Sequence, residues 1–311
     1  MTTRPAIAYL VLFAMGAGWG LSVPLAKIAV STGHQPLGLI FWQLVVVVTL
    51  LGAINMARRK PLELGRQYWR PYLAIAMCGA VMPDIFFYLA AERLPGGIMA
   101  IIIASVPIFS LPIALALGNE RFAWRRVLGL SFGLAGIVLL IGPEASLPDR
   151  AMAAFVPIAL LAPMLYATEG NLVAKWGTQG LDSIQTILGA SLLGLVITLP
   201  LALGTGQWVD PTASFGLPEL ALIASAAIHG IVYAVYVWLV GRAGSVFAAQ
   251  TSYLVTGCGV LWSMLLLGER YALLVWVALG VMMIGVALVQ PRARNQPLAP
   301  HPGIGDAGGH A

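Results

Sequence analysis

The chain has 311 residues, of which 59% are hydrophobic and only 9% are charged, and its mean hydropathy is +0.90. A soluble domain carries roughly a quarter charged residues, so this composition excludes a water-soluble globular protein and predicts an integral membrane protein. The net charge of +5 does not indicate nucleic-acid binding, because the basic residues lie in short segments between apolar runs. Cys78 and Cys258 both lie inside apolar runs, so we predict neither a structural disulfide nor a metal site.

Ten apolar runs are each close to the roughly 20 residues that a membrane-spanning helix requires. Pro- and Gly-containing segments separate them. We therefore predict an all-α integral membrane protein with ten transmembrane helices, the first of which is retained rather than cleaved as a signal peptide. The predicted helices cover 6–31, 37–57, 71–91, 95–117, 124–142, 152–176, 183–203, 217–241, 245–267 and 271–290. The Pro- and Gly-rich residues 291–311 predict a disordered tail.

One stretch of the sequence occurs twice, with no gap between the copies when they are aligned. Residues 118–140 align with residues 267–289, so that Glu120 pairs with Glu269 and Arg121 with Arg270. We therefore predict two related five-helix repeats, residues 1–143 and 144–290. Because five is odd, the second repeat enters the membrane from the opposite side. Inverted repeats of this kind in transporters hold the substrate site near the middle of the bilayer.

The distribution of Lys and Arg predicts the orientation in the membrane. If the N-terminus lies in the cytoplasm, thirteen basic residues fall on the cytoplasmic side and three on the outer side, and Lys27 falls within the first helix. We therefore predict that both termini are cytoplasmic. The cytoplasmic set is Arg4, Arg58, Arg59, Lys60, Arg66, Arg70, Arg121, Arg125, Arg126, Lys175, Arg242, Arg292 and Arg294, and the outer set is Arg93, Arg150 and Arg270.

The paired turns carry a family resemblance. Two five-helix halves, each with a Glu-Arg turn before its last helix, resemble the drug/metabolite transporter superfamily, and within it the ten-helix EamA-type exporters. The stretch from Ala14 to Gly20, which includes Trp19, and Pro24 behind it are also similar. The likeness covers residues 6–290, and within that branch the chain looks most like the bacterial aromatic amino acid exporters. It implies a bacterial inner-membrane carrier that moves small metabolites outward without ATP, with the lipid bilayer and a small molecule as its partners and no cofactor.

Asp84 is one of three ionisable residues well inside predicted helices, where an Asp or Lys costs about 2.5–3.5 kcal/mol on insertion scales. It follows Pro83 and shares a helix face with Tyr88. One interpretation is a contact for a substrate ammonium or a proton carrier. The other is an ion pair with Lys27, which lies at a similar predicted depth.

Glu169 is another of these three ionisable residues, and Lys27 is the remaining one. One interpretation is that Glu169 lines the inner mouth of the path, and the other is that it caps or pairs with Lys175 near the membrane interface. Lys27, Asp84, Glu169 and His229 are the predicted candidates for ion pairing or proton coupling.

Aromatic and polar side chains near the middle of several helices predict a cavity. His229, Tyr233 and Tyr236 share one face of the eighth helix, and Trp19 lies near the middle of the first. Interfacial belts do not explain rings at this depth. We predict that such faces converge on an apolar cavity for a flat, amphipathic ligand, although a packing role is the alternative for each residue alone. The predicted set is Trp19, Met82, Asp84, Tyr88, Met99, Tyr166, His229, Tyr233, Tyr236, Gln250 and Tyr253.

Prolines and small residues predict where helices bend or approach closely. Pro24, Pro83 and Pro107 are the predicted kink or hinge positions. The spacing of Gly16 and Gly20 predicts close packing within the chain. For Gly129 and Gly133 on the fifth helix the contact lies either within the chain or between two copies, so both a monomer and a homodimer are open.

The function predicted from these features is export of small metabolites by alternating access, with amino acids, and aromatic ones in particular, as the substrate. The alternative is a carrier of another class of small metabolite or drug. A carrier of phosphorylated or nucleotide sugars would require deep basic residues, for which Lys27 is the sole candidate. A membrane-embedded enzyme would require a catalytic cluster, and His229 has no second His near it in the sequence, so no enzymatic activity is predicted. Glu120 and Glu269 are interpreted as structural residues at the starts of the fifth and tenth helices.

Overall fold

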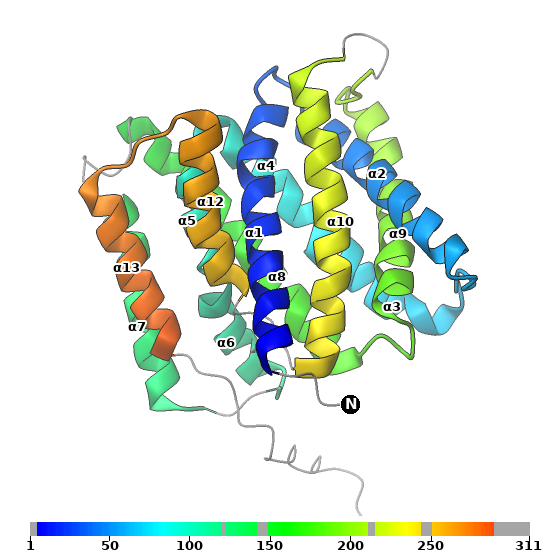
Figure 1. Ribbon diagram of the computed structural model, residues 1–311, viewed down its shortest axis with the longest axis horizontal. Helices are drawn as coiled ribbons and strands as arrows, with labels where there is room; N and C mark the ends of the chain where they lie inside the picture. Colours follow the sequence, from blue (N-terminus) through cyan, green and yellow to red (C-terminus); the bar gives the residue numbers. More distant parts are fainter. Residues whose placement is uncertain (1–4, 120–121, 142–148, 211–214, 244–250, 289–311) are drawn as a thin grey trace, which may run out of the picture.

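The computed structural model describes residues 5–119, 122–141, 149–210, 215–243 and 251–288, and the described residues are helical with short connections (Figure 1). Seven stretches are long and apolar enough to cross a membrane, and three shorter apolar helices lie at 127–139, 254–267 and 273–285. These ten positions coincide with the ten predicted spans, so the prediction of an all-α, ten-helix membrane protein is confirmed. The predicted tail at 291–311 lies outside the described residues.

The helices follow one another with few residues between them. In chain order they are α1 (Pro5–Ala29), α2 (Pro36–Ala57), η1 (Arg66–Tyr68), α3 (Trp69–Ala74), η2 (Ile75–Val81), α4 (Met82–Arg93), α5 (Gly96–Ile103), α6 (Val106–Ala116), α7 (Trp124–Ile141), η3 (Arg150–Phe155), α8 (Val156–Trp176), α9 (Ser183–Gly204), α10 (Leu217–Ala243), α12 (Thr251–Leu267) and α13 (Leu273–Leu288).

Two of the predicted spans are interrupted near a proline. The third span passes through the π-helical segment η2 before Pro83, which stands in the first turn of α4. Proline has no N–H to donate to the carbonyl four residues earlier, so the regular hydrogen-bond ladder cannot continue there. The fourth span breaks at Ala104 and Ser105, just before Pro107 in the first turn of α6. Pro24, in contrast, lies inside the continuous helix α1.

Corresponding helices of the two halves make corresponding contacts with the other half. Helix α1 contacts α10 and α12, and its counterpart α8 contacts α4 and α6. Helix α2 pairs with its own counterpart α9, and α7 pairs with α13, at the left edge of Figure 1. This pattern is unchanged when the halves are interchanged, as a twofold relation between them requires.

Helices α2 and α9 run in opposite directions. Near the start of α2, the Leu37 amide donates to Gln207 Oε1 at 3.0 Å, beyond the end of α9. Near the end of α2, Arg58 reaches Asp182 at the start of α9. The start of α2 and the ends of α9 and α12 lie at the upper end of the bundle in Figure 1, which is called the Glu269 end below because Glu269 follows α12. The ends of α2 and α8 and the start of α9 lie at the lower end, which is called the Asp182 end because Asp182 precedes α9.

Apolar side chains cover much of the outer surface of the bundle. Leu10, Val138, Val196 and Leu265 are each more than 60% exposed. Inside, Leu39, Ile40, Ile98 and their neighbours form a fully buried core. A soluble protein would not leave so many large apolar side chains in contact with water, whereas lipid solvates them.

Close packing between helices depends on glycine where α1 meets α12. A Cβ added at Gly16 would lie 2.1 Å from Leu254 Cβ, and one at Gly20 would lie 2.9 Å from Cys258 Cβ. The predicted close packing of this pair within the chain is therefore confirmed. On the fifth helix, a Cβ at Gly133 would lie 2.3 Å from Ile108 Cδ1 of the same chain, which makes the contact at this position intramolecular.

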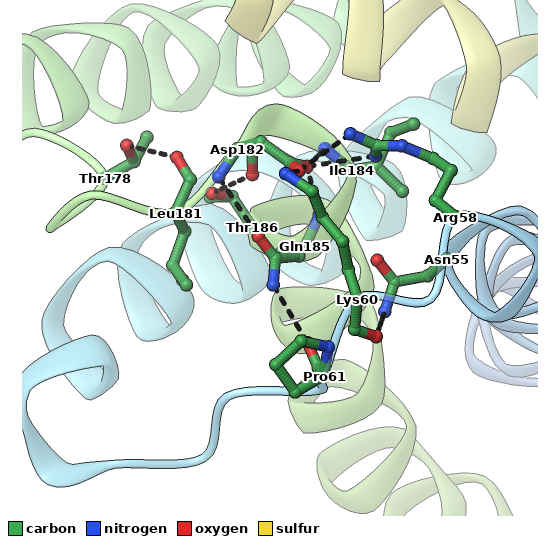
Figure 2. A network of polar contacts seen from close by, with 10 residues as sticks. All are labelled: Asn55, Arg58, Lys60, Pro61, Thr178, Leu181, Asp182, Ile184, Gln185 and Thr186. Atoms are coloured by element: carbon green, nitrogen blue, oxygen red, sulfur yellow. Dashed lines mark hydrogen bonds and ion pairs between the residues drawn. The ribbon is translucent and has the colours of Figure 1, made fainter.

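Polar contacts at the Asp182 end tie α2 to α9 (Figure 2). Asp182 caps α9 by accepting from the amides of Ile184 at 3.0 Å and Gln185 at 3.1 Å. The same carboxylate accepts from Arg58 Nη2 at 2.9 Å and Lys60 Nζ at 2.6 Å. Partial burial would raise the pKa of Asp182, but these donors outweigh it and lower the pKa to about 2.

The Glu269 end is held by a carboxylate on backbone amides. Glu269 accepts from the amides of Gly96 at 2.8 Å and Gly97 at 3.1 Å, and from the Tyr271 hydroxyl. Burial and the neighbouring carboxylate raise the pKa of Tyr271, which keeps its hydroxyl protonated. The interpretation of Glu269 as a structural residue is therefore supported, but the helix start to which it is hydrogen-bonded is that of α5, which packs against α12. Glu120 lies outside the described residues.

Replacing Gly16 with alanine should destabilise the fold. The added methyl would meet Leu254 and force α1 away from α12, and overpacking of this kind costs about 1–3 kcal/mol. Thermal unfolding in detergent is the measurement. Gly280→Ala on α13 is the matched control, since nothing lies within 4 Å of its added Cβ. Equal melting temperatures for the two variants would contradict the α1–α12 packing.

Asp182→Ala should lower the melting temperature more than Asp182→Asn. The alanine removes an N-cap worth about 1 kcal/mol, whereas asparagine keeps the acceptor and loses only exposed ion pairs. The pKa of Asp182 is depressed in the folded protein, so its ionised form stabilises the fold above about pH 4 and this contribution is lost as the pH falls towards 2. The difference in melting temperature between wild type and Asp182→Asn should therefore become smaller as the pH falls from about 4 towards 2. A difference that does not change with pH would contradict the ion pairs of Asp182.

Candidate functional site

A cavity of about 150 Å³ lies where the two halves meet. Its walls come from both halves and combine aromatic rings, small polar groups and two carboxyl groups. The lining residues are Trp19, Ser22, Val23 and Ala26 of α1, Gln43 of α2, Gly79 of η2, Asp84, Phe87 and Tyr88 of α4, Ile103 and Val106 of α5 and α6, Tyr166 and Glu169 of α8, Ser225, His229, Tyr233 and Tyr236 of α10, and Thr251, Ser252 and Val255 of α12.

Asp84 is the centre of a hydrogen-bonded chain on one wall. Its side chain accepts from Gln43 Nε2 at 2.7 Å and from the Tyr166 hydroxyl at 2.9 Å. Gln43 in turn accepts from the Tyr88 hydroxyl at 2.5 Å. The chain joins α2, α4 and α8, and it supplies each of these buried polar groups with a partner.

The structure contradicts the alternative in which Asp84 pairs with Lys27. Lys27 Nζ donates to the carbonyls of Ala91 at 2.6 Å and Glu92 at 3.2 Å, at the end of α4. Similar depth along two helices does not make two residues neighbours. Lys27 instead binds backbone carbonyls at a helix C-terminus, where a cation is favoured.

Glu169 lies inside the cavity wall and does not pair with Lys175. Its side chain is only 4% exposed, and Lys175 Nζ donates to the Leu117 carbonyl at 3.3 Å. The Tyr233 hydroxyl is close to Glu169, and Gly79 makes room for both. A Cβ at Gly79 would lie 2.2 Å from the Tyr233 oxygen and 3.1 Å from Glu169 Cγ.

Four aromatic rings from α1 and α10 form another part of the wall. The Trp19 centroid lies 5.4 Å from that of Tyr236, 6.0 Å from His229 and 6.1 Å from Tyr233. The planes are tilted by 51–58°, as is common for aromatic clusters. The Trp19 indole N–H is buried without a hydrogen-bond partner among the described residues.

The remaining predicted site residues lie elsewhere. Met99 is 1% exposed and packs in the apolar core. Met82 precedes Asp84 by two positions, which turns it to another face of the helix and away from the lining. Gln250 lies outside the described residues, as does the side chain of Tyr253.

The sequence profile of the EamA-like transporter family matches this chain twice, at residues 6–142 and 154–290. The chain belongs to the EamA-like transporter family. It is therefore a membrane transporter of the drug/metabolite superfamily, as its resemblance indicated.

Curated relatives of this EamA-like transporter include proteins from several bacteria. The chain is 31% identical to Protein PecM of Dickeya dadantii over 179 residues, which is 56% of each chain. It is 25% identical over 286 residues, 89% of each chain, to the uncharacterized inner membrane transporter YedA of Escherichia coli K12. A probable terminal-alkyne amino-acid exporter of Streptantibioticus cattleyicolor is 24% identical over 279 residues, 88% of this chain and 90% of that one.

A protein of known crystal structure shares the fold. It superposes with a TM-score of 0.64 at 15% identity, covering 92% of this chain and 96% of the other. At that identity the likeness concerns the fold alone.

Several cavity residues of this EamA-like transporter were not predicted from the sequence, notably Gln43, Phe87 and Thr251. A signal for Gln43 was present, because it is a polar amide within an apolar run that includes Val45 to Val48. A buried amide requires partners, and the partners of Gln43 are Asp84 and Tyr88. Among the described residues, no three His, Cys, Asp or Glu side chains are grouped so as to hold a metal ion.

Gln43→Leu should destabilise this transporter. It leaves an Asp84 oxygen and the Tyr88 hydroxyl without a partner, and each such loss costs about 1–3 kcal/mol. Thermal unfolding in detergent is the measurement. Thr49→Val on the exposed face of α2 is the control. If the two variants are equally stable, Gln43 does not hold this wall together.

Proposed function

We propose that the protein exports small metabolites, most favourably amino acids with aromatic side chains, by alternating access through the central cavity. One observation carries the proposal, namely a cavity between the two halves that combines the Trp19 ring cluster with the Asp84 chain. Rings accommodate a flat apolar group, and polar groups orient its amine. The printed name of the Streptantibioticus cattleyicolor relative supports the substrate class.

The proposed orientation places the Asp182 end in the cytoplasm of a bacterium, with both termini on that side of the inner membrane. The positive-inside bias supports it, since Arg58, Lys60 and Lys175 lie at the Asp182 end. The inner membrane as the location is supported by the printed name of the Escherichia coli relative.

A second, larger hollow supports a route from the cytoplasm. A groove of about 980 Å³ lies at the Asp182 end, between Val11 of α1, Leu51 of α2, Val173 of α8 and Trp238 of α10. Helix α10 lines both hollows, because Tyr236 faces the cavity and Trp238 the groove. We propose that substrate enters through this groove and leaves when the Glu269 end opens.

Opening of the Glu269 end requires contacts there to break. Trp42 Nε1 donates to the Val209 carbonyl at 2.9 Å, and His34 contacts Glu219 at 2.9 Å. The breaks beside Pro83 and Pro107 are the proposed bending points. If export is coupled to protons, Asp84, Glu169 and His229 are the candidate carriers.

The cavity disfavours the alternative substrates. Among its described lining residues there is no Lys or Arg to bind a sugar phosphate or a nucleotide sugar. The two carboxyl groups would instead repel such anions.

Trp19→Ala should reduce flux of labelled phenylalanine or tryptophan in proteoliposomes about tenfold or more, which corresponds to about 1.4 kcal/mol. The reason is the loss of the central ring of the aromatic wall. Tyr233→Ala should have a similar effect. Phe13→Ala is the matched control, because this ring also lies on α1 but is 56% exposed. Flux at the wild-type rate in both cavity variants would show that substrate does not pass through this chamber.

A further inference from the structure

We propose that the cavity recognises its substrate by the amine alone, which sits between Asp84 and Glu169 while an aromatic group lies against Trp19, and that it does not bind a substrate carboxylate. The preferred substrates are then amines that carry an aromatic group, and amino acids are accepted because they also carry an amine. The inference rests on the proposed export through this cavity and replaces its preferred substrate class.

The charge of the cavity is the first argument. Asp84 and Glu169 are 5% and 4% exposed, and both line the chamber. Among the described lining residues no Lys or Arg is present to balance them. Lys27, one residue beyond the lining residue Ala26, is held by the carbonyls of Ala91 and Glu92. A buried carboxylate without a counter-ion is costly, so a cationic ligand is strongly favoured over an anionic one.

The segment that precedes α12 adds no basic residue to offset the two carboxyl groups of the cavity. Residues 244–250 lie outside the described residues, and their sequence, GSVFAAQ, contains no Lys or Arg. A carboxylate on the ligand therefore has no basic residue from this segment to meet.

The two carboxyl groups lie on the same side of the chamber. Tyr166 donates to Asp84, and Tyr166 and Glu169 are three positions apart on one face of α8. An ionised carboxylate offers about four acceptor sites, and protein donors to Asp84 occupy two of them. Acceptor sites are therefore left for the three N–H groups of a primary ammonium.

Other residues that line the cavity suit the rest of the ligand. The Trp19 face can pack against an aromatic group and attract the positive charge next to it. Thr251 is 1% exposed, lines the chamber, and its hydroxyl has no hydrogen-bond partner among the described residues. A hydroxyl can accept as well as donate, so this unpartnered group is available to an ammonium donor.

Three indole compounds test the inference on the purified full-length protein. Tryptamine has the amine only, indole-3-propionate the carboxylate only, and tryptophan both. Binding is measured by the ligand-dependent rise in melting temperature, which needs no transport. We expect tryptamine to bind at least as tightly as tryptophan, and indole-3-propionate at least tenfold more weakly than tryptamine.

Variants of Asp84 and Glu169 test whether the amine binds between these two residues. Glu169→Gln and Asp84→Asn should each weaken tryptamine binding about tenfold or more. Glu92→Gln, which removes a carboxylate outside the chamber at an exposed position beside Arg93, should leave binding unchanged. Because the comparison of three ligands uses the wild type, the test stands even if a variant does not fold.

The possible outcomes test the inference about the amine separately from the proposed export of amino acids. Indole-3-propionate binding as tightly as tryptamine, or tryptophan binding without tryptamine, would overturn the inference, while export of labelled amino acids would keep the function. Failure of all three ligands to bind would likewise overturn the inference. If tryptamine binds as expected but no amino acid or amine is transported, the inference survives and the proposal of export fails.

Discussion

The hydrogen bonds that Asp84 accepts from Gln43 and Tyr166 are the contacts on which the centre of the molecule depends. Lipid offers no hydrogen bonds, so a carboxyl group in the membrane interior must be satisfied by protein or ligand. Because Gln43 belongs to the first half of the chain and Tyr166 to the second, satisfying Asp84 also holds the halves together around a chamber. The hydrogen bonds to Asp84 therefore account both for the polar wall of the cavity and for the contact between the two halves there.

The two ends of the bundle are tied by different chemistry, although the repeats are related. At the Asp182 end, two basic side chains meet one carboxylate that also caps α9. At the Glu269 end, a carboxylate binds the bare amides of α5. Contacts of both kinds can break and re-form at modest cost, since their donors and acceptors become accessible to water when an end opens. This fits a protein that opens at one end at a time.

The ten spans and the related halves could be predicted, because the length of an apolar run and a gapless repeat can both be read directly from the sequence. It also predicted that the rings of Trp19, Tyr233 and Tyr236 belong together. It could not predict the partner of Lys27, since depth along a helix does not identify the neighbouring helix. For the same reason Glu269 was assigned to the helix that follows it, whereas its partner α5 lies far away in sequence. Gln43 was overlooked because one amide barely alters an apolar run.

Access to the cavity from each side of the membrane is the most direct test of alternating access through it. Cys78 and Cys258 are first replaced, and Ser225, which is 5% exposed on the chamber wall, is changed to cysteine. A membrane-impermeant maleimide is then applied from either face of oriented vesicles. Alternating access predicts labelling from both faces, with the ratio of labelling from the two faces shifted by a transported substrate. Labelling from one face only, whatever substrate is present, would contradict alternating access through this chamber.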